Sequence, residues 1–277
     1  MATALIRSHH TRHEAQPLFI DPWGDVLVPQ AFKDRLAERS GLLDPYVQSI
    51  PSYSSVVHRS RYAEDALEKA VGAGVRQYVS VGAGFDSFSL RRPAYAADVQ
   101  VFELDHPATQ DTKRRQLAAN AIPEPALTHF IATDLGQESL RSALQRSPFR
   151  LDAPAFFAWL GVTIYLTREA NSMALRGFGE SGAPGSQLVF TYVDERAFDP
   201  AHESEAFRRL RTNSERVGEP FICGFKPTEM PGYLASLGLE LVEDLGGVEL
   251  ERRYADATRK TLAPMSADSR IVLACVT

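Results

Sequence analysis

The chain has 277 residues, of which 44% are hydrophobic and 23% charged, an ordinary composition for a globular protein with a large core. Its net charge of −5 argues against a nucleic-acid groove, because such a groove normally needs a basic face. The two cysteines, Cys223 and Cys275, lie far apart and form no disulfide framework, which fits a reducing cytoplasm. We therefore expect a cytoplasmic protein with a single α/β domain and no nucleic-acid partner.

The first 13 residues are rich in basic side chains and contain no apolar stretch of the kind that a signal peptide needs. His9 and His13 are four residues apart and could bind zinc if a third ligand were supplied. Basic neighbours surround this pair, however, and no HExxH-type base lies between the two histidines. We therefore expect a solvated basic segment and no metal site.

Residues 1–72 are predicted to form an irregular helical cap in front of the sheet. A short helix is expected over 31–39, a loop over 44–55, and a second helix over 62–71 that ends at Gly72. A cap of this kind usually covers the ligand cleft of the domain that follows, although it could equally be an inert addition.

The segment 77–87, QYVSVGAGFDS, is the central motif of the sequence. An apolar, β-rich run over 77–81 leads directly into Gly82, Ala83 and Gly84. In an open α/β sheet such a turn presents a nucleotide at the carboxyl end of the first strand. Glycine suits these positions, because a side chain would hold the ligand away from the backbone.

Asp86 distinguishes between two classes of nucleotide. Dinucleotide enzymes place a pyrophosphate over this turn and usually carry a third glycine, where this chain has Ser87. The carboxylate of Asp86 would repel a phosphate, but it would favour a cationic amino group or a sulfonium. We therefore expect S-adenosylmethionine, with a dinucleotide and a purely structural glycine turn as the competing hypotheses.

Strands and helices alternate from residue 77 onward. Strands are predicted at 77–81, 100–104, 128–132, 154–160, 186–192, 239–245 and 271–276. A helix over 107–119 is expected to expose Lys113, Arg114 and Arg115, and an insertion at about 195–226 is expected to lie over the cleft. The order predicts a seven-stranded sheet within residues 73–277, with helices on both faces. The longest apolar stretch, 153–166, is too short and too interrupted to span a membrane.

Polar residues follow the predicted strands at the edge where a nucleotide would bind. Glu103 and Asp105 end the second strand, and either could bind the ribose hydroxyls. Asp134 follows the third strand, where it could meet an adenine amino group or cap the next helix.

Residues after the fourth and fifth strands are candidates for the acceptor site. Thr163 and Tyr165 could donate hydrogen bonds to an acceptor, and Tyr192 could form part of an apolar wall with the turn 221–225. His202 is the one histidine downstream of the fourth strand that could serve as a base.

The motifs VGAGFDS at 81–87, VFELDHP at 101–107 and FFAWLGVTIYLT at 156–167 resemble the leucine carboxyl methyltransferase family. The segments LFIDPW at 18–23, RSRYAED at 59–65 and ATDL at 132–135 extend this resemblance over nearly the whole chain. The family includes bacterial O-methyltransferases similar to those that tailor polyketides. The resemblance implies a class I methyltransferase fold, which is Rossmann-like, with S-adenosylmethionine as methyl donor.

The resemblance also implies roles for individual donor-site residues. Arg59 would pair with the methionine carboxylate, and Asp105 rather than Glu103 would bind the ribose. The glycine turn would be formed by Gly82, Ala83, Gly84 and Asp86, and adenine would be contacted by Asp134 and Leu135.

Two features depart from the family pattern. At Leu160, which we assign to the donor site, members that methylate proteins carry a glutamate. This departure weakens the case for a protein substrate. The basic N-terminal residue of the family's donor site has no secure counterpart, and His10 or Arg12 could each take its place.

The type of acceptor decides whether a catalytic base is needed. A carboxylate is already ionised at pH 7, with a pKa of about 4, whereas a phenol with a pKa of about 10 must lose a proton to a side chain. We see no His–acid dyad after the fourth strand, so we expect a methyl ester on the carboxylate of a small molecule. The alternative is base-assisted methylation of a hydroxyl group. A nicotinamide dehydrogenase and an inactive binding module are the competing classes.

Overall fold

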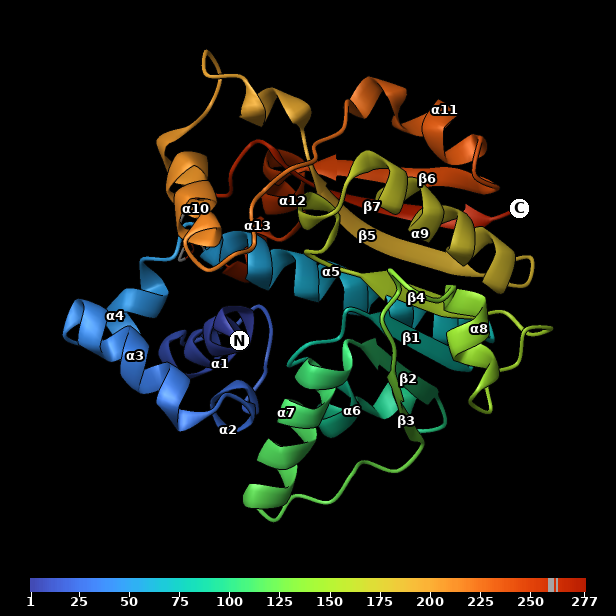
Figure 1. Ribbon diagram of the computed structural model, residues 1–277, viewed down its shortest axis with the longest axis horizontal. Helices are drawn as coiled ribbons and strands as arrows, with labels where there is room; N and C mark the ends of the chain where they lie inside the picture. Colours follow the sequence, from blue (N-terminus) through green and yellow to red (C-terminus); the bar gives the residue numbers. More distant parts are fainter. Residues whose placement is uncertain (259–261, 263) are drawn as a thin grey trace.

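A seven-stranded sheet in the order β3-β2-β1-β4-β5-β7-β6 forms the centre of the computed structural model, which describes residues 1–258, 262 and 264–277 (Figure 1). The first five strands are parallel, and β7 runs antiparallel to both β5 and β6. The prediction of seven strands with a terminal strand pair is therefore confirmed. The strands are β1 (Gln77–Val81), β2 (Gln100–Asp105), β3 (Thr128–Ala132), β4 (Phe156–Trp159), β5 (Gln187–Val193), β6 (Leu239–Gly246) and β7 (Ser269–Val276).

Helices cover both faces of the sheet, which is why β1 and β4 are buried along their whole length. Alternate residues of β1 enter two different cores: Tyr78 packs toward α5, whereas Val79 packs toward α8 and α9. The helices before β1 are α1 (Ala2–His13), α2 (Gly24–Leu27), α3 (Gln30–Ser40), α4 (Leu43–Gln48) and α5 (Tyr53–Gly72). The later helices are α6 (Phe88–Arg91), α7 (Pro107–Ala119), α8 (Leu140–Gln145), α9 (Arg168–Ser181), α10 (Glu205–Glu215), α11 (Met230–Ala235), α12 (Gly247–Arg253) and α13 (Ala255–Thr258). In the described parts of the chain, no helix is both long and apolar enough to cross a bilayer.

The N-terminal segment is a buried helix, so the prediction of a solvated basic segment is wrong. Helix α1 packs against α2, α4 and α5, and it buries Arg7, His9 and His10 together with its apolar side chains. Each of these three side chains has at least one partner: His10 Nε2, for example, accepts a hydrogen bond from the Leu18 N–H at 2.9 Å, although its Nδ1 has none among the described residues. These partners lie outside α1, so the helix's own sequence does not reveal its burial.

The predicted loop at 44–55 is also wrong. Helix α4 occupies its first part, and α5 already begins at Tyr53, nine residues before the predicted start at Tyr62. Pro45 fits the first turn of α4, where its missing N–H costs no hydrogen bond. Val47, Val56 and Val57 are buried in the core, and this tertiary burial outweighs the local preference for a loop.

Lys113 was expected on the exposed side of the helix 107–119, and this prediction is wrong. In α7 the side chains of Gln110, Lys113 and Leu117 form the buried face. The Lys113 ammonium group pairs with the buried carboxylate of Glu103 and donates a hydrogen bond to the carbonyl of Asp86 at 2.5 Å. Lys113 can point inward because the buried carboxylate of Glu103 compensates its charge.

Replacing Lys113 by alanine should therefore destabilise the fold strongly. The Glu103 carboxylate would stay buried without its cation, at a cost of about 3–5 kcal/mol in the free energy of unfolding. The control is Arg114→Ala on the same helix, which removes an exposed pair with Glu124 and should cost about 1 kcal/mol or less. Urea denaturation of the two variants measures both values, and equal losses would contradict this role for Lys113.

Candidate active site

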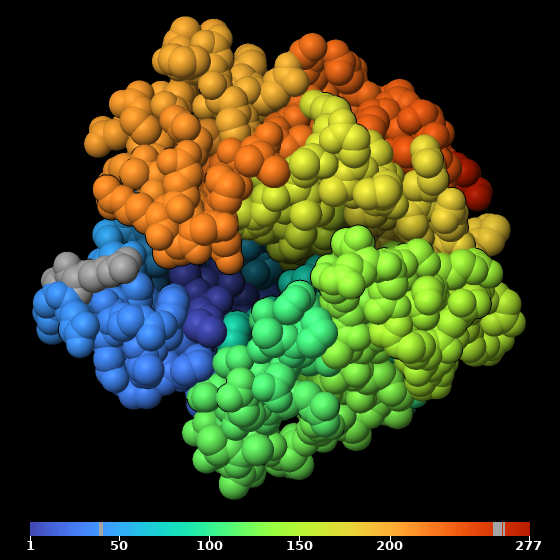
Figure 2. All heavy atoms as spheres, in the orientation of Figure 1, coloured from blue at the N-terminus to red at the C-terminus, as the bar shows by residue number. Residues whose placement is uncertain are grey.

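Two neighbouring cavities open at the carboxyl ends of β1, β4 and β5. The first, of about 300 Å³, surrounds residues 82–86 and is called the glycine-turn cavity. The second, of about 570 Å³, lies under residues 202–221 and is called the insertion cavity. Thr3, Arg59 and Gly161 line both cavities. Figure 2 shows the surface hollowed between the orange residues around α10, the blue N-terminal helices and the green segment around α7.

The glycine turn needs its two glycines for conformational reasons. Gly82 and Gly84 have φ values of 67° and 54°, in the left-handed region that favours glycine. A Cβ on Gly82 would also lie 2.9 Å from a methyl carbon of Val162. The register of the parallel strands sets Val81 opposite Leu104, so that Asp105 reaches the turn and accepts a hydrogen bond from the Gly84 N–H.

Three buried cations hold the segment that follows the glycines. Arg7 donates to the carbonyl of Phe85 at 2.8 Å, and Lys113 donates to the carbonyl of Asp86. Arg91 donates to the Ser87 hydroxyl at 2.9 Å. Each cation also has its own carboxylate, in the pairs Arg7–Asp21, Lys113–Glu103 and Arg91–Glu64.

The carboxylate of Asp86 stays ionised among these cations. Burial acts to raise its pKa, but the charges of Arg7, Lys113 and Arg91 and the N–H of Phe88 together hold the pKa below its ordinary value. Asp86 lines the glycine-turn cavity, and a cationic group bound there would meet a fixed negative charge.

Arg59 differs from these cations because it has no carboxylate. Its guanidinium lies over Gly161 so closely that a Cβ there would come within 2.8 Å of both terminal nitrogens. No hydrogen bond or ion pair joins it to any residue that the structure describes. Burial lowers the pKa of Arg59 to about 10, and the neighbouring charge of Arg7 also lowers it. A half-buried guanidinium that lines both cavities and has no anion among the described residues indicates a site for an anionic ligand group.

The basic N-terminal residue at the glycine-turn cavity is Arg7, rather than His10 or Arg12. Arg7 lines the cavity from α1. His10 is bound to the backbone of Leu18, and Arg12 pairs with Asp44 on the outer side of the helices. No local sequence pattern indicates this position of Arg7, because its carboxylate partner, Asp21, is 14 residues away.

The two acids of β2 have separate roles in the structure. Asp105 accepts hydrogen bonds from Gly84 and from the N–H of His106 at 2.6 Å, and burial raises its pKa. Glu103 accepts a hydrogen bond from Ser89 at 2.6 Å and is paired with Lys113. The fold therefore leaves Asp105 as the acid at the glycine turn.

Asp134 and Leu135 follow β3 at the same edge of the sheet, in an exposed loop beyond the glycine-turn cavity. Asp134 accepts hydrogen bonds from the N–H of Gly136 at 2.9 Å and from the Gln137 amide at 2.8 Å. The cap of α8 is Ser139, so the competing interpretation of Asp134 as that cap is wrong.

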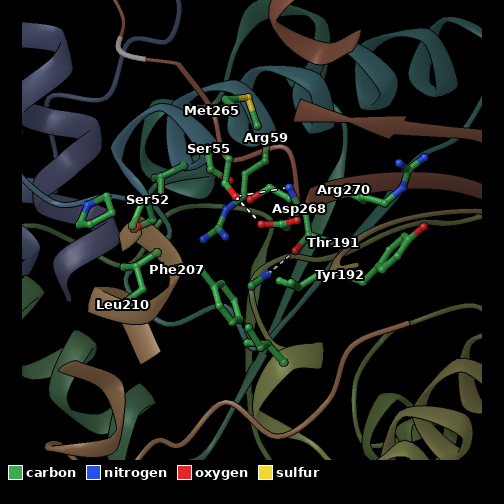
Figure 3. A pocket seen from close by; sticks show the side chains of 18 of the residues that line it. Ser52, Ser55, Arg59, Thr191, Tyr192, Phe207, Leu210, Met265, Asp268 and Arg270 are labelled. Carbon is green, nitrogen blue, oxygen red and sulfur yellow. Dashed lines mark hydrogen bonds between the residues drawn. The ribbon is translucent and has the colours of Figure 1, made fainter. Parts of the chain in front are cut away.

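The three predicted acceptor-site residues have different orientations. The Thr163 hydroxyl donates to the carbonyl of Thr191 at 2.7 Å, which fixes the turn after β4. Tyr165 is 37% exposed and packs edge-on against Phe221 in the insertion cavity. Tyr192 points away from Arg59, as Figure 3 shows, and its hydroxyl donates to Asp244 at 2.7 Å.

The apolar wall predicted from Tyr192 and the turn 221–225 is found in part. Phe221 of that turn lines the insertion cavity together with Ile164, Phe207 and Leu210. Tyr192 also borders the cavity, but its side chain packs in the core on the other face of the sheet, because successive residues of β5 face opposite sides.

The insertion contributes a histidine–acid pair that sequence reasoning missed. His202 lines the insertion cavity, and its Nδ1 lies 3.0 Å from Asp199 Oδ2. The expectation of no such dyad after the fourth strand is therefore wrong. The signal available in the sequence was that Asp199 and His202 are three residues apart, a separation at which a single turn can bring two side chains together.

The chain is similar to known proteins in sequence and in fold. The model of the leucine carboxyl methyltransferase family matches residues 1–178. YktD of Bacillus subtilis (strain 168), whose name describes it as an S-adenosyl-L-methionine-dependent methyltransferase, is 30% identical over 265 residues, covering 88% of this chain and 86% of YktD. A protein of Mycobacteroides abscessus with the same description is 30% identical over 259 residues, covering 85% of this chain and 80% of the relative.

Two solved structures share the fold. A DUF574 family protein from Streptomyces avermitilis has a TM-score of 0.62 at 15% identity, covering 99% of this chain and 97% of that one. A protein from Thermobifida fusca YX described as a methyltransferase has a TM-score of 0.58 at 16% identity, covering 99% of this chain and 94% of that one. These two structures show the fold, and the relatives identify S-adenosylmethionine as the cofactor. The residues present fit it, since its carboxylate suits the unpaired Arg59 and its cationic groups suit Asp86.

Replacing Arg59 by methionine should weaken S-adenosylmethionine binding at least about tenfold, because charge-assisted hydrogen bonds worth about 1.5–3 kcal/mol are lost. The thermal stability of the cofactor-free protein should not fall, since the lost charge had no partner. Titration calorimetry and thermal unfolding measure the two effects.

Arg7→Met is the matched control from the same cavity. It leaves the buried Asp21 carboxylate unpaired, so the cofactor-free protein should lose about 3–5 kcal/mol. If Arg59→Met destabilises the cofactor-free protein as much as Arg7→Met, Arg59 has a structural role and its assignment to the ligand is wrong.

Proposed function

The chain belongs to the leucine carboxyl methyltransferase family, and we propose that this S-adenosylmethionine-dependent methyltransferase methylates an oxygen atom of a small-molecule acceptor. The observation that carries the proposal is the junction of the two cavities at Arg59 and Gly161. A donor held there by its methionine carboxylate would lie next to an acceptor in the insertion cavity.

The donor would be held at four points along the sheet edge. Arg59 would bind the carboxylate, and Asp86 would face the amino group. Asp105 would accept hydrogen bonds from the ribose hydroxyls, and the loop carrying Asp134 and Leu135 would contact adenine. The positive-φ glycines let the backbone approach the ligand closely.

The insertion cavity suits a small acceptor. Its volume of about 570 Å³ lies within the usual range of small-molecule sites. The apolar side chains of Ile164, Phe207 and Phe221 would exclude water around the reacting atoms. Leu160, which lines the glycine-turn cavity, stands where protein-methylating members have a glutamate, and this also favours a small molecule.

When bound, S-adenosylmethionine supplies an electrophilic methyl carbon on a positively charged sulfur. Transfer of this methyl group to an acceptor oxygen would depend mainly on how the residues of this chain position the acceptor and exclude water. This chain's contribution is therefore the fixed turn Thr163–Tyr165 and the wall of the insertion cavity, which orient the acceptor.

A carboxylate is the acceptor that we favour. The name of the matching family, leucine carboxyl methyltransferase, refers to methylation of a carboxyl group. In addition, the hydroxyl-bearing residues Thr3, Ser52 and Ser55 line the insertion cavity beside Arg59. Arg59 is assigned to the donor, but these hydroxyl groups can donate hydrogen bonds to the oxygens of an acceptor carboxylate. The product would be a methyl ester.

The alternative acceptor is a hydroxyl group, and the His202–Asp199 pair supports it. Asp199 would orient the imidazole through its contact with Nδ1, while His202 would remove the hydroxyl proton. The product would then be a methyl ether.

The pH dependence of the methyl-transfer step separates the two acceptors. A carboxylate is ionised throughout, so the single-turnover rate should be nearly constant between about pH 6 and pH 9, and His202→Ala should change it little. The product should hydrolyse in mild alkali. His129→Ala, far from both cavities on β3, is the control for loss of a histidine.

An alkali-stable product would contradict carboxyl methylation. If its rate of formation also rises with pH and falls about 100-fold or more in His202→Ala, the enzyme is a base-assisted hydroxyl methyltransferase.

A further inference from the structure

The N-terminal helices bring together three metal-ligating side chains that the methyltransferase site does not use. His9 and His13 lie one turn apart on α1, and Asp44 comes from α4, which packs beside α1 (Figure 1). One possible ligand atom from each of the three lies within 4.8 Å of the other two. The sequence offered the two histidines without a third ligand, and the fold supplies one.

The geometry around each ligand is already constrained. The imidazole rings of His9 and His13 stack with their centroids 4.2 Å apart, and His13 Nε2 lies 3.2 Å from Asp44 Oδ2. His9 is buried, and its Nδ1 is bonded to the Tyr53 hydroxyl at 2.9 Å. This bond leaves Nε2 as the ligand atom, in the arrangement that metal-binding histidines usually have.

Arg12 is the charge with which a metal ion would compete. It donates to Asp44 Oδ1 at 2.9 Å and also pairs with Asp25. Because Asp25 would remain as its partner, Arg12 can release Asp44 without losing every ion pair. The other oxygen of Asp44 already faces His13.

We propose that His9, His13 and Asp44 form a binding site for a divalent transition metal of the Zn²⁺ type. Two imidazole nitrogens and one carboxylate oxygen are ligands that Zn²⁺ prefers, with water in the remaining position. The ion would join α1 to α4. Through Tyr53 it would also fix the first turn of α5, which carries Ser52 and Ser55 into the insertion cavity. The proposal does not depend on the identity of the methyl acceptor.

The test uses the full-length chain without an affinity tag, freed of metal by a chelator and titrated with ZnCl₂ in a calorimeter. We expect saturable binding of one Zn²⁺ per chain, and a rise in the unfolding temperature when Zn²⁺ is present. His13→Ala and Asp44→Asn should each weaken binding about tenfold or more. Titration of the same samples with S-adenosylmethionine confirms that each variant is folded.

The matched control is His202→Ala, since His202 is another exposed histidine paired with an aspartate. It should bind Zn²⁺ as the unmodified chain does. Arg12→Ala should tighten binding, because it removes the competing cation from Asp44. Failure to observe saturable binding, or equal Zn²⁺ affinity in His13→Ala, Asp44→Asn and His202→Ala, would overturn the proposal.

Discussion

The unpaired guanidinium of Arg59 is the interaction on which the site depends. This half-buried cation has no anion among the residues that the structure describes, so the binding of a carboxylate next to it is favourable. Its position over Gly161, where both cavities meet, ties donor binding to the place of reaction. Part of the free energy of donor binding would therefore come from the pairing of the Arg59 guanidinium with the donor carboxylate.

The surrounding cations show why Arg59 stands out. Arg7, Lys113 and Arg91 are also buried, but each has a carboxylate and each holds one residue of the segment 85–87. These pairs fix the backbone of the glycine turn before a ligand arrives, which lowers the entropy cost of binding. Paired cations therefore build the site, and the unpaired one is left for the ligand.

The acceptor side is assembled from different parts of the chain. The family match ends at residue 178, whereas His202, Phe207 and Phe221 lie in the insertion beyond it. The family therefore establishes the donor and the reaction class, but only part of the insertion cavity lies within the matched region. Its histidine, His202, and the aromatic residues Phe207 and Phe221 lie outside it.

The sequence by itself determined what depends on local backbone preference. The apolar run before Gly82 and Gly84 predicted the first strand and its turn, and Pro107 correctly marked the start of α7. Alternation of strands and helices was enough for the seven-stranded sheet. These features rest on residues close together in the chain, so their patterns are visible without the fold.

Only the tertiary structure decided which charged groups are paired. It buried Lys113 against Glu103, placed Arg7 at the glycine turn, and joined His202 to Asp199 beside the insertion cavity. It also turned Tyr192 toward the opposite core, because the register of β5 in the sheet fixes the side that each residue faces. The environment of a side chain depends on residues that are distant in sequence, and the energy of a charge depends on that environment. For this reason the role of each charged residue follows from the folded structure and not from its neighbours in the sequence.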